Sequence, residues 1–593
     1  MLERIVVTPN RNPAEESTVG SAVTKITKGE IDAQSLPLAI DYLAQVPGVA
    51  ISSPGGPGAE GSLSIRGAAR RYIKTLYNGI DIADMTSPQV QTTYQHLLGG
   101  NIDSIEVLRG SQSTLYGSDA IAGVISISTF GETDPGIRHI AFVEGGSLAT
   151  GQGGYGLRAA NEQSKLSLNV IGFRTDGISA AAIGSERDGY ENITGDFNVE
   201  HSFSESFSVF ASGVYIDGKA DFDDDGYLDF ASGDFVPPSD NLTARNESDM
   251  KAARFGFNID LADGRFRNTV SFQGFDTTRE ISGTFFDGIY TGNRRKADYH
   301  GTFEASDWLM VQGGGDYETQ EATFPESVFN PEINSDFSLG GVWAEAVMNP
   351  VEPLTLTAGL RYDEHSEFGG FTTYRATGSY LFEGTGTRLH SSVGTGFRAP
   401  SLNELFGPFG ANPFLEPETS LSFDAGVEQT FLDGAATTDV TWFLLDIDDL
   451  IQYTNHYEQV PGKSRHRGIE ASLSYGAADW LDLTGAYTYT QSENASGERN
   501  IRIPRHQIGL TATARPWDKW MISAAARIAL DTVDQNDFEL DDYVLVDAKV
   551  GYKPTGETEL YMRVENLLDQ DYQTVRGFGT PGFSAFAGFK AEF

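Results

Sequence analysis

An acidic stretch of the chain has the residue types and spacing of a calcium loop. Asp221, Asp223 and Asp225 stand two residues apart and Gly226 follows them, which matches positions one, three, five and six of such a loop. Position twelve, where a bidentate Glu is expected, is Ser232. The stretch alone therefore does not complete a calcium shell, and a solvated acidic loop is the alternative interpretation.

The residue patterns of common enzyme classes are missing from the sequence. The chain has no Cys, which excludes disulfides and thiolate chemistry, and its nine His are scattered. It also lacks a G-x-S-x-G elbow, a P-loop and an H-E-x-x-H helix. We therefore expect a protein that is not an enzyme and that needs no catalytic cofactor.

The charge balance of the chain narrows the class of partner. Lys and Arg number 42 and Asp and Glu number 83, so the formal net charge is −41. A phosphate backbone would be repelled by this charge, which argues against nucleic acid as a partner. The first residues show no basic segment followed by an apolar core, so export would require a signal that this numbering does not include.

Most of the chain alternates between apolar and polar residues with a period of two. In the stretch 354–362, Leu and Tyr side chains share one face with Ala358, while Thr355, Thr357 and Arg361 share the other. Similar segments recur from about Gly136 to Phe593, and no run approaches the roughly 18 apolar residues of a membrane helix. Apolar-out, polar-in alternation over so many segments favours a transmembrane β-barrel over a soluble sandwich.

The connections and the last segment agree with a barrel. Long loops are predicted near 216–251 and 280–300, and a tight turn at Asp263-Gly264. The segment 583–593 places Phe and Ala on one face and ends on an aromatic residue, Phe593. It resembles the closing strand of outer-membrane barrels.

Residues 1 to about 133 predict a different kind of domain. Ser35 and Pro37 precede a stripe of Leu and Ile side chains that stops at Pro47, which predicts a short amphipathic helix from Ser35. Brief strands are predicted at 63–66, 73–76 and 104–108. The segment therefore reads as a small α+β domain.

An ordered set of motifs runs through both regions. In the first region these are Ile5-Val-Val-Thr-Pro9, Leu43-Ala-Gln-Val-Pro-Gly-Val49, Ile65-Arg-Gly67, Tyr77-Asn-Gly-Ile-Asp81 and the stretch 105–127, which begins Ile105-Glu-Val-Leu-Arg-Gly-Ser111. In the second region they are the stretch 396–406, which begins Gly396-Phe-Arg-Ala-Pro400, then Asn412-Pro-Phe-Leu-Glu-Pro-Glu418, Asp446-Ile-Asp-Asp-Leu-Ile451, Arg467-Gly-Ile-Glu470 and the stretch 564–572, which begins Val564-Glu-Asn-Leu-Leu568. In this order and spacing they closely resemble the TonB-dependent outer-membrane receptors. Within that resemblance, Ile5, Val6, Val7, Thr8 and Pro9 look like the TonB box.

The resemblance implies a fold and a function. It implies an all-β membrane protein, a barrel of about 22 antiparallel strands with an N-terminal α+β plug in its lumen. We expect a TonB-box segment at 1–12, a plug at 13–133 and a transmembrane barrel at 134–593. The expected function is active import of a scarce ligand across the bacterial outer membrane. The expected partners are TonB, which pairs with the box by strand addition, the small-molecule ligand and outer-membrane lipids.

In total length and in the stretch from Thr175-Asp-Gly177 through Asp188-Gly-Tyr190 to 217–229, the chain most resembles the cobalamin (vitamin B12) receptors within the family. Those receptors order their extracellular loops with calcium. This implies that Glu186 and Asp188 join Asp221, Asp223 and Asp225 in a shared calcium site. A ferric-siderophore receptor is the alternative within the family, and a passive pore or adhesin is the alternative from another class. A haem receptor is disfavoured because the stretch 401–411 has no His.

The resemblance also implies two further sets of residues. Arg66 and Arg109 of the plug would pair with Glu428 and Glu470 of the barrel, because a guanidinium can bridge carboxylates. The ligand would contact two plug apex segments, 54–61 and 84–91. The candidate contacts are Gly55, Gly56, Pro57, Gly58, Met85, Thr86 and Ser87.

Overall fold

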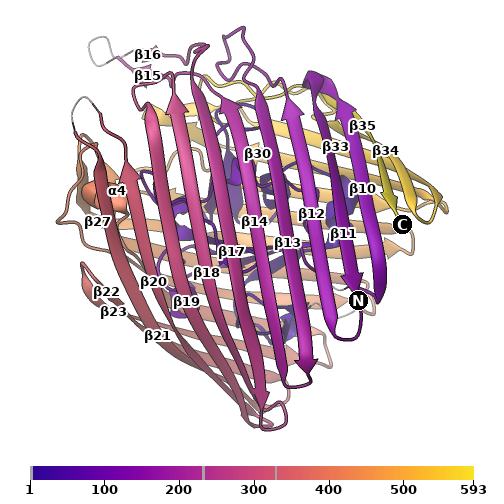
Figure 1. Cartoon of the computed structure of the whole chain (residues 1–593). Helices are drawn as coiled ribbons and strands as arrows, with labels where there is room; N and C mark the ends of the chain where they lie inside the picture. Colours follow the sequence, from indigo (N-terminus) through magenta and orange to yellow (C-terminus); the bar gives the residue numbers. More distant parts are fainter. Residues whose placement is uncertain (1–4, 132, 230–233, 328–329) are drawn as a thin grey trace.

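A computed structural model of the chain describes residues 5–131, 133–229, 234–327 and 330–593. Its main body is a closed barrel of 22 antiparallel strands that surrounds an N-terminal domain, the plug (Figure 1). Both expectations for the fold are thereby confirmed. None of the helices among the described residues has the length and hydropathy needed to cross a bilayer.

The plug is a small mixed domain built around a five-stranded sheet in the order β3-β8-β9-β6-β7. Its helices and strands are β1 (Ile5–Val6), β2 (Ala14–Glu15), β3 (Val23–Ile26), α1 (Lys28–Gln34), α2 (Ala39–Leu43), β4 (Val49–Ser52), β5 (Ser62–Ile65), β6 (Ile73–Tyr77), β7 (Ile80–Asp81), β8 (Ser104–Arg109), α3 (Ser113–Tyr116) and β9 (Gly123–Ser128). Leu63, Ile105 and Ile125 are fully buried in its core. The core also includes Phe173 and Leu445 of the barrel, so plug and barrel share one apolar interior.

The helix expected from Ser35 is placed differently. Thr27 caps α1 through a capping box with Glu30, and Ser35 ends that helix in the left-handed conformation with φ of 56°. The next helix, α2, begins only at Ala39, with Leu38 at its N-cap. The prediction that Ser35 begins a helix is therefore wrong: it is the C-cap of α1. A Ser can occupy either end of a helix, so the residue type alone does not distinguish the two.

The barrel strands follow one another around the wall in sequence order. They are β10 (Gly136–Gly146), β11 (Gly151–Ala160), β12 (Ser164–Thr175), β13 (Tyr190–Ser204), β14 (Phe207–Asp221), β17 (Arg245–Leu261), β18 (Phe266–Ser282), β19 (Gly288–Ser306), β20 (Leu309–Phe324), β21 (Ile333–Val351), β22 (Leu354–His365), β23 (Gly369–Phe382), β24 (Thr387–Arg398), β25 (Glu418–Phe431), β26 (Ala436–Tyr453), β27 (Tyr457–Ala478), β28 (Leu481–Glu493), β29 (His506–Ala514), β30 (Trp520–Leu530), β33 (Tyr543–Thr555), β34 (Thr558–Glu565) and β35 (Ser584–Glu592). The last strand pairs with both β34 and β10, which closes the barrel. Closure leaves no strand edge unpaired in the lipid.

The period-two pattern sets the two faces of the wall. On β22, Leu356, Leu360 and Tyr362 are exposed on the outer face, while Thr357 and Arg361 are buried against the lumen. The outer face therefore suits lipid and the inner face suits a polar plug.

Connections at the two ends of the barrel differ in length. One end has short turns, such as 262–265 between β17 and β18. The other end carries longer loops, among them 222–244 with β15 (Tyr227–Leu228) and β16 (Phe235–Val236), 399–417 with α4 (Leu402–Phe406), and 531–542 with β31 (Thr532–Asp534) and β32 (Phe538–Leu540). The long loop predicted at 280–300 is wrong, because β18 and β19 extend through most of it and leave only 283–287. The acidic and Gly-rich residues of this stretch belong instead to the ends of two long barrel strands, β18 and β19.

Candidate functional site

The Ile5–Pro9 segment is held inside the barrel. Val6 pairs with Ala14 of β2 and is fully buried. The backbone N–H groups of Val7 and Thr8 and the Thr8 hydroxyl all donate to one oxygen, Oε2 of Glu106, at 3.0, 2.9 and 2.7 Å. One carboxylate on β8, an inner strand of the plug sheet, therefore accepts three of the hydrogen bonds that hold this segment in place.

Two further contacts anchor the residues next to it. The Tyr116 hydroxyl donates to the Thr8 carbonyl at 2.8 Å. The Arg11 guanidinium contacts both carboxylate oxygens of Asp298 on β19, at 2.8 and 3.1 Å. The segment must leave these partners before another chain can pair with it.

We expect Glu106→Ala to release this segment while the rest of the plug stays folded. The substitution removes an acceptor that serves three donors, and those donors can then turn to water. A spin label on Val7→Cys reports the release by electron paramagnetic resonance, and the chain has no other Cys to label. The label should become mobile in Glu106→Ala and stay immobile in the control Glu15→Ala, whose side chain is exposed. An equally immobile label in both variants would show that Glu106 does not retain the segment.

The predicted arginine–glutamate set is brought together in part. Arg66 contacts Glu470 through Nε at 2.9 Å and through Nη2 at 3.0 Å, and Arg109 lies 3.3 Å from the same carboxylate. Arg66 also contacts Asp424 on β25 at 3.3 Å. Glu428 does not join them: it pairs with Arg388 at 2.7 Å. Asp424 and Glu428 lie on the same lumen face of β25, four residues apart. The alternation along the strand therefore does not distinguish which of them contacts Arg66.

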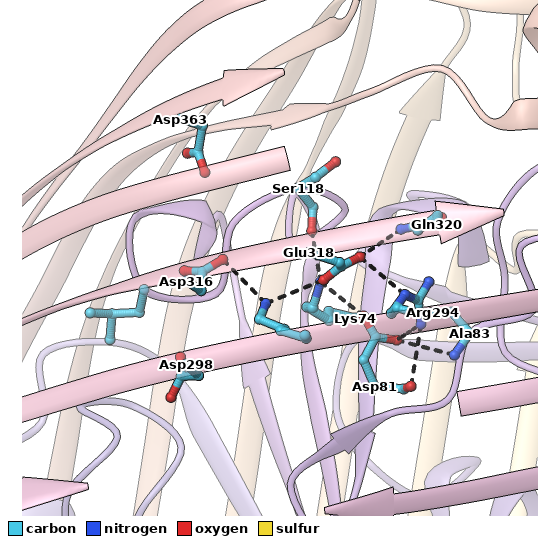
Figure 2. Close-up of polar contacts among 12 residues, drawn as sticks. Lys74, Asp81, Ala83, Ser118, Arg294, Asp298, Asp316, Glu318, Gln320 and Asp363 are labelled. Atoms are coloured by element: carbon cyan, nitrogen blue, oxygen red, sulfur yellow. Dashed lines mark hydrogen bonds and ion pairs between the residues drawn. The ribbon is translucent and has the colours of Figure 1, made fainter. Parts of the chain in front are cut away.

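A second ion network between plug and barrel was not anticipated (Figure 2). Asp81 of β7 contacts Lys74 of β6 at 3.0 Å and Arg294 of β19 at 3.1 Å. Arg294 in turn contacts Glu318 of β20 at 3.1 Å. The network continues through Lys296, Asp316, Arg361 and Asp363 along β19, β20 and β22. The sequence does carry a signal, because charged residues recur at every second position in 294–298 and 316–318.

Three acidic side chains converge among the long loops. Carboxylate oxygens of Glu186, Asp223 and Asp240 lie within 4.8 Å of one another. Asp188 is next to them and accepts a hydrogen bond from the Ala180 backbone N–H at 2.6 Å. Burial and the neighbouring carboxylates Asp223 and Asp240 raise the pKa of Glu186 to about 7, and burial raises the pKa of Asp188 to about 6. Such crowding of negative charge can hold a divalent cation.

The members of this cluster differ from the predicted set. Asp221 pairs with Arg245 at 2.8 Å, and Asp225 is exposed and lies outside the group of three. Asp240 takes their place in the cluster. It lies later in the 222–244 loop, outside the calcium-loop spacing of Asp221, Asp223 and Asp225, so that pattern does not predict it. Ser232, at loop position twelve, lies outside the described residues.

The two predicted apex segments have different surroundings. Gly55 to Gly58 lie beside the 176–189 loop, where a Cβ on Gly55 would be 3.0 Å from Ala180. Met85, Thr86 and Ser87 are fully buried, and Asp84 accepts hydrogen bonds from both hydroxyls. Only Pro88 is exposed at the tip of this second segment.

Family models match both domains. Residues 143–567 match the TonB dependent receptor-like β-barrel, and residues 15–124 match the TonB-dependent receptor plug domain. The chain is 25% identical to the vitamin B12 transporter BtuB of Vibrio vulnificus over 604 residues, covering 97% of this chain and 92% of that protein. It is also 25% identical to BtuB of Photobacterium profundum, covering 96% and 92%.

Solved structures share the fold at lower identity. The ferric enterobactin receptor from Pseudomonas aeruginosa is 17% identical, with a TM-score of 0.81 and coverage of 97% of this chain and 100% of that one. The siderophore receptor PirA from Acinetobacter baumannii is also 17% identical, with a TM-score of 0.81 and coverage of 98% and 99%. The domain matches, the closed barrel and the enclosed plug lead to one conclusion: the chain belongs to the TonB-dependent receptors, the importers of the bacterial outer membrane.

Proposed function

We propose that this receptor imports cobalamin or a related corrinoid. The observation that carries the proposal is the near full-length similarity to two vitamin B12 transporters. Charge is compatible with it, because a chain with a formal charge of −41 repels an anionic ligand at long range and does not repel a neutral one. Cobalamin is rich in amides and carries little net charge.

The proposed mechanism has three steps. The long loops and the plug apex, including Gly55 to Gly58, capture the ligand. The Ile5–Pro9 segment is then released from Glu106, and TonB pairs with it by strand addition. Force applied through this pairing opens the plug.

Equilibrium binding tests the ligand directly. Purified receptor is titrated with cyanocobalamin and, separately, with a panel of ferric siderophores. Cyanocobalamin should bind far more tightly than every siderophore. Tight binding of a ferric siderophore, with no binding of cyanocobalamin, would overturn the proposal and identify the protein as a ferric-siderophore receptor. The siderophore-receptor likenesses concern the fold, at 17% identity, and do not favour that class.

We further propose that calcium binds at Glu186, Asp223 and Asp240, with Asp188 beside them. Oxygen ligands in irregular geometry suit calcium, and the ion would relieve the repulsion between the carboxylates. Loops 176–189 and 222–244 would then be ordered before the ligand arrives, so less entropy would be lost on capture.

We expect calcium to tighten cyanocobalamin binding by about tenfold or more, the scale of a typical coupling between two sites. Titrations with chelator and with added calcium measure the effect. Asp223→Asn and Asp240→Asn should abolish it, whereas the matched control Asp225→Asn should keep it. A dissociation constant that is indifferent to calcium in the unmodified receptor would overturn this site.

The same titration should depend on pH. Calcium needs the ionised carboxylates, and in its absence Glu186 and Asp188 keep their protons up to about pH 7 and about pH 6. Calcium must therefore displace protons as the pH falls through this range, so its affinity should decrease from pH 8 to pH 6.

A further inference from the structure

The contacts between plug and barrel are distributed unevenly around the wall. On one side ion pairs tie the plug to the barrel. Asp81 pairs with Arg294 of β19 (Figure 2), and Arg66 pairs with Asp424 of β25 and Glu470 of β27, all of them buried. The partly buried Arg71 pairs with the buried Glu418 of β25. Removing one partner of a buried ion pair leaves an uncompensated charge, so these contacts resist separation.

The five neighbouring strands β28, β29, β30, β33 and β34 present a different surface. Among the described residues, no plug side chain forms an ion pair with them, and none of their residues belongs to the shared apolar core. Around α2 and β4 the plug contacts them through neutral hydrogen bonds: the Gly48 N–H donates to the Thr488 hydroxyl at 2.8 Å, and the Gln507 amide donates to the Val49 carbonyl at 3.2 Å. The charged contact on these strands lies at the end of α1, where Lys549 of β33 donates to the Asp32 carbonyl and the Ser35 hydroxyl, both at 2.8 Å. The neutral hydrogen bonds are more easily exchanged for water than buried ion pairs.

A cavity of about 210 Å³ lies between the plug and these same strands. Its plug wall runs from the apex at Pro57 and Gly58 through α2 to Gln45 and Val46. Its barrel wall includes Ala486 of β28, Gly509 of β29, Ala529 of β30, Leu545 of β33 and Glu565 of β34. The space therefore begins beside the long loops and reaches towards the middle of the wall.

We infer that the passage for the imported ligand opens along this cavity, between the α2–β4 wall of the plug and strands β28 to β34. A pull on the N-terminal segment loads the whole plug, and the face with the weakest attachment yields first. The existing space also lets that wall move without opening a new void in a packed interior. The ion-paired face would stay attached and keep the plug in the barrel.

The lining indicates which solutes would pass most easily. It contains three carboxylates, Asp41, Asp547 and Glu565, and one guanidinium, Arg527. Thr488, Gln507 and Tyr572 add neutral hydrogen-bonding groups. This set favours neutral or cationic polar solutes over multivalent anions.

Engineered disulfides in this Cys-free chain test the route. A Cβ on Gly509 would lie 3.9 Å from the Gln45 Cα, with no heavy atom nearer than 3.5 Å, so Gln45→Cys/Gly509→Cys can bridge the cavity side. The control is Ser111→Cys/Ser420→Cys, whose hydroxyl oxygens lie 3.0 Å apart between the plug and β25 on the ion-paired side.

The readout is the ion conductance of the full-length receptor in planar bilayers, opened by urea below the unfolding range. Oxidation of the cavity-side pair should lower the urea-induced conductance by at least about tenfold, because a disulfide keeps the two walls together. Reduction should restore it, and the oxidised control pair should conduct like the unmodified receptor. Ions are the probe, so the result does not depend on the proposed corrinoid ligand.

Two outcomes would overturn the inference. In the first, the oxidised cavity-side pair conducts as well as its reduced form, which would place the opening elsewhere. In the second, both oxidised pairs block, which would mean that the plug leaves as a whole. Hydrogen exchange of the unmodified receptor provides an independent measurement: with added urea, amides at 39–52 should lose protection before those at 73–77. The reverse order would also count against the route.

Discussion

Val6→Pro should abolish energised uptake and leave ligand binding unchanged. Val6 is one of the β-branched residues of the Ile5–Pro9 segment, and pairing with TonB by strand addition would use its backbone N–H. Proline has no such donor and fixes φ, so an added strand loses a ladder hydrogen bond. Cells that carry the variant should bind labelled cyanocobalamin normally and accumulate no more than cells without TonB.

Ala14→Pro is the matched control for this variant. Ala14 is the intramolecular partner of Val6 across β1 and β2, so its replacement disturbs the resting pair without altering the segment offered to TonB. Uptake should persist in Ala14→Pro. Uptake by Val6→Pro at the unmodified rate would remove this segment from the mechanism.

Arg66→Ala should produce the largest loss of stability at the plug–barrel interface. The Arg66 side chain is 2% exposed, and its partners Glu470 and Asp424 are 3% and 0% exposed. Without the guanidinium, the buried Asp424 loses its ion-pair partner and Glu470 keeps only Arg109 at 3.3 Å. Breaking a buried pair in this way costs about 3–5 kcal/mol. Calorimetry should show a lower midpoint for plug release, and bilayers should show higher resting conductance.

Two comparison variants make the measurement specific. Arg109→Ala should have a smaller effect, because Arg66 still neutralises Glu470. Arg138→Ala should have none, because its pairs with Asp134 and Glu592 are exposed to solvent. Unchanged conductance together with an unchanged thermal midpoint in Arg66→Ala would show that this cluster does not hold the plug.

The sequence predicts the barrel well because the two faces of each strand meet different surroundings. On β22 the alternation of Leu356 and Leu360 with Thr357 and Arg361 fixes which side meets lipid. Strand ends are predicted less well: β18 and β19 extend beyond the apolar band, where polar residues can still pair in a ladder. Composition alone therefore assigned those strand ends to a loop.

The candidate sites depend on contacts between distant segments, which limits prediction from one sequence. Glu106 stands 98 residues from Thr8, and neither residue marks the other in the sequence. Asp240 reaches Glu186 and Asp223 only because two loops fold together. Glu428 and Asp424 both lie on the lumen face of β25. Only the position of Arg66 along the barrel axis decides which of the two carboxylates it contacts, and the sequence does not give that position.

The seam between β10 and β35 also constrains how the barrel is made. The first and last strands of the wall are hydrogen-bonded neighbours, from Ile140 opposite Glu592 to Gly146 opposite Phe586. The wall therefore cannot close until its last strand, which begins at Ser584, pairs with its first, and a partly assembled wall has two free edges. Free edges invite pairing with other chains, so this intermediate is prone to aggregation and needs protection between export and insertion.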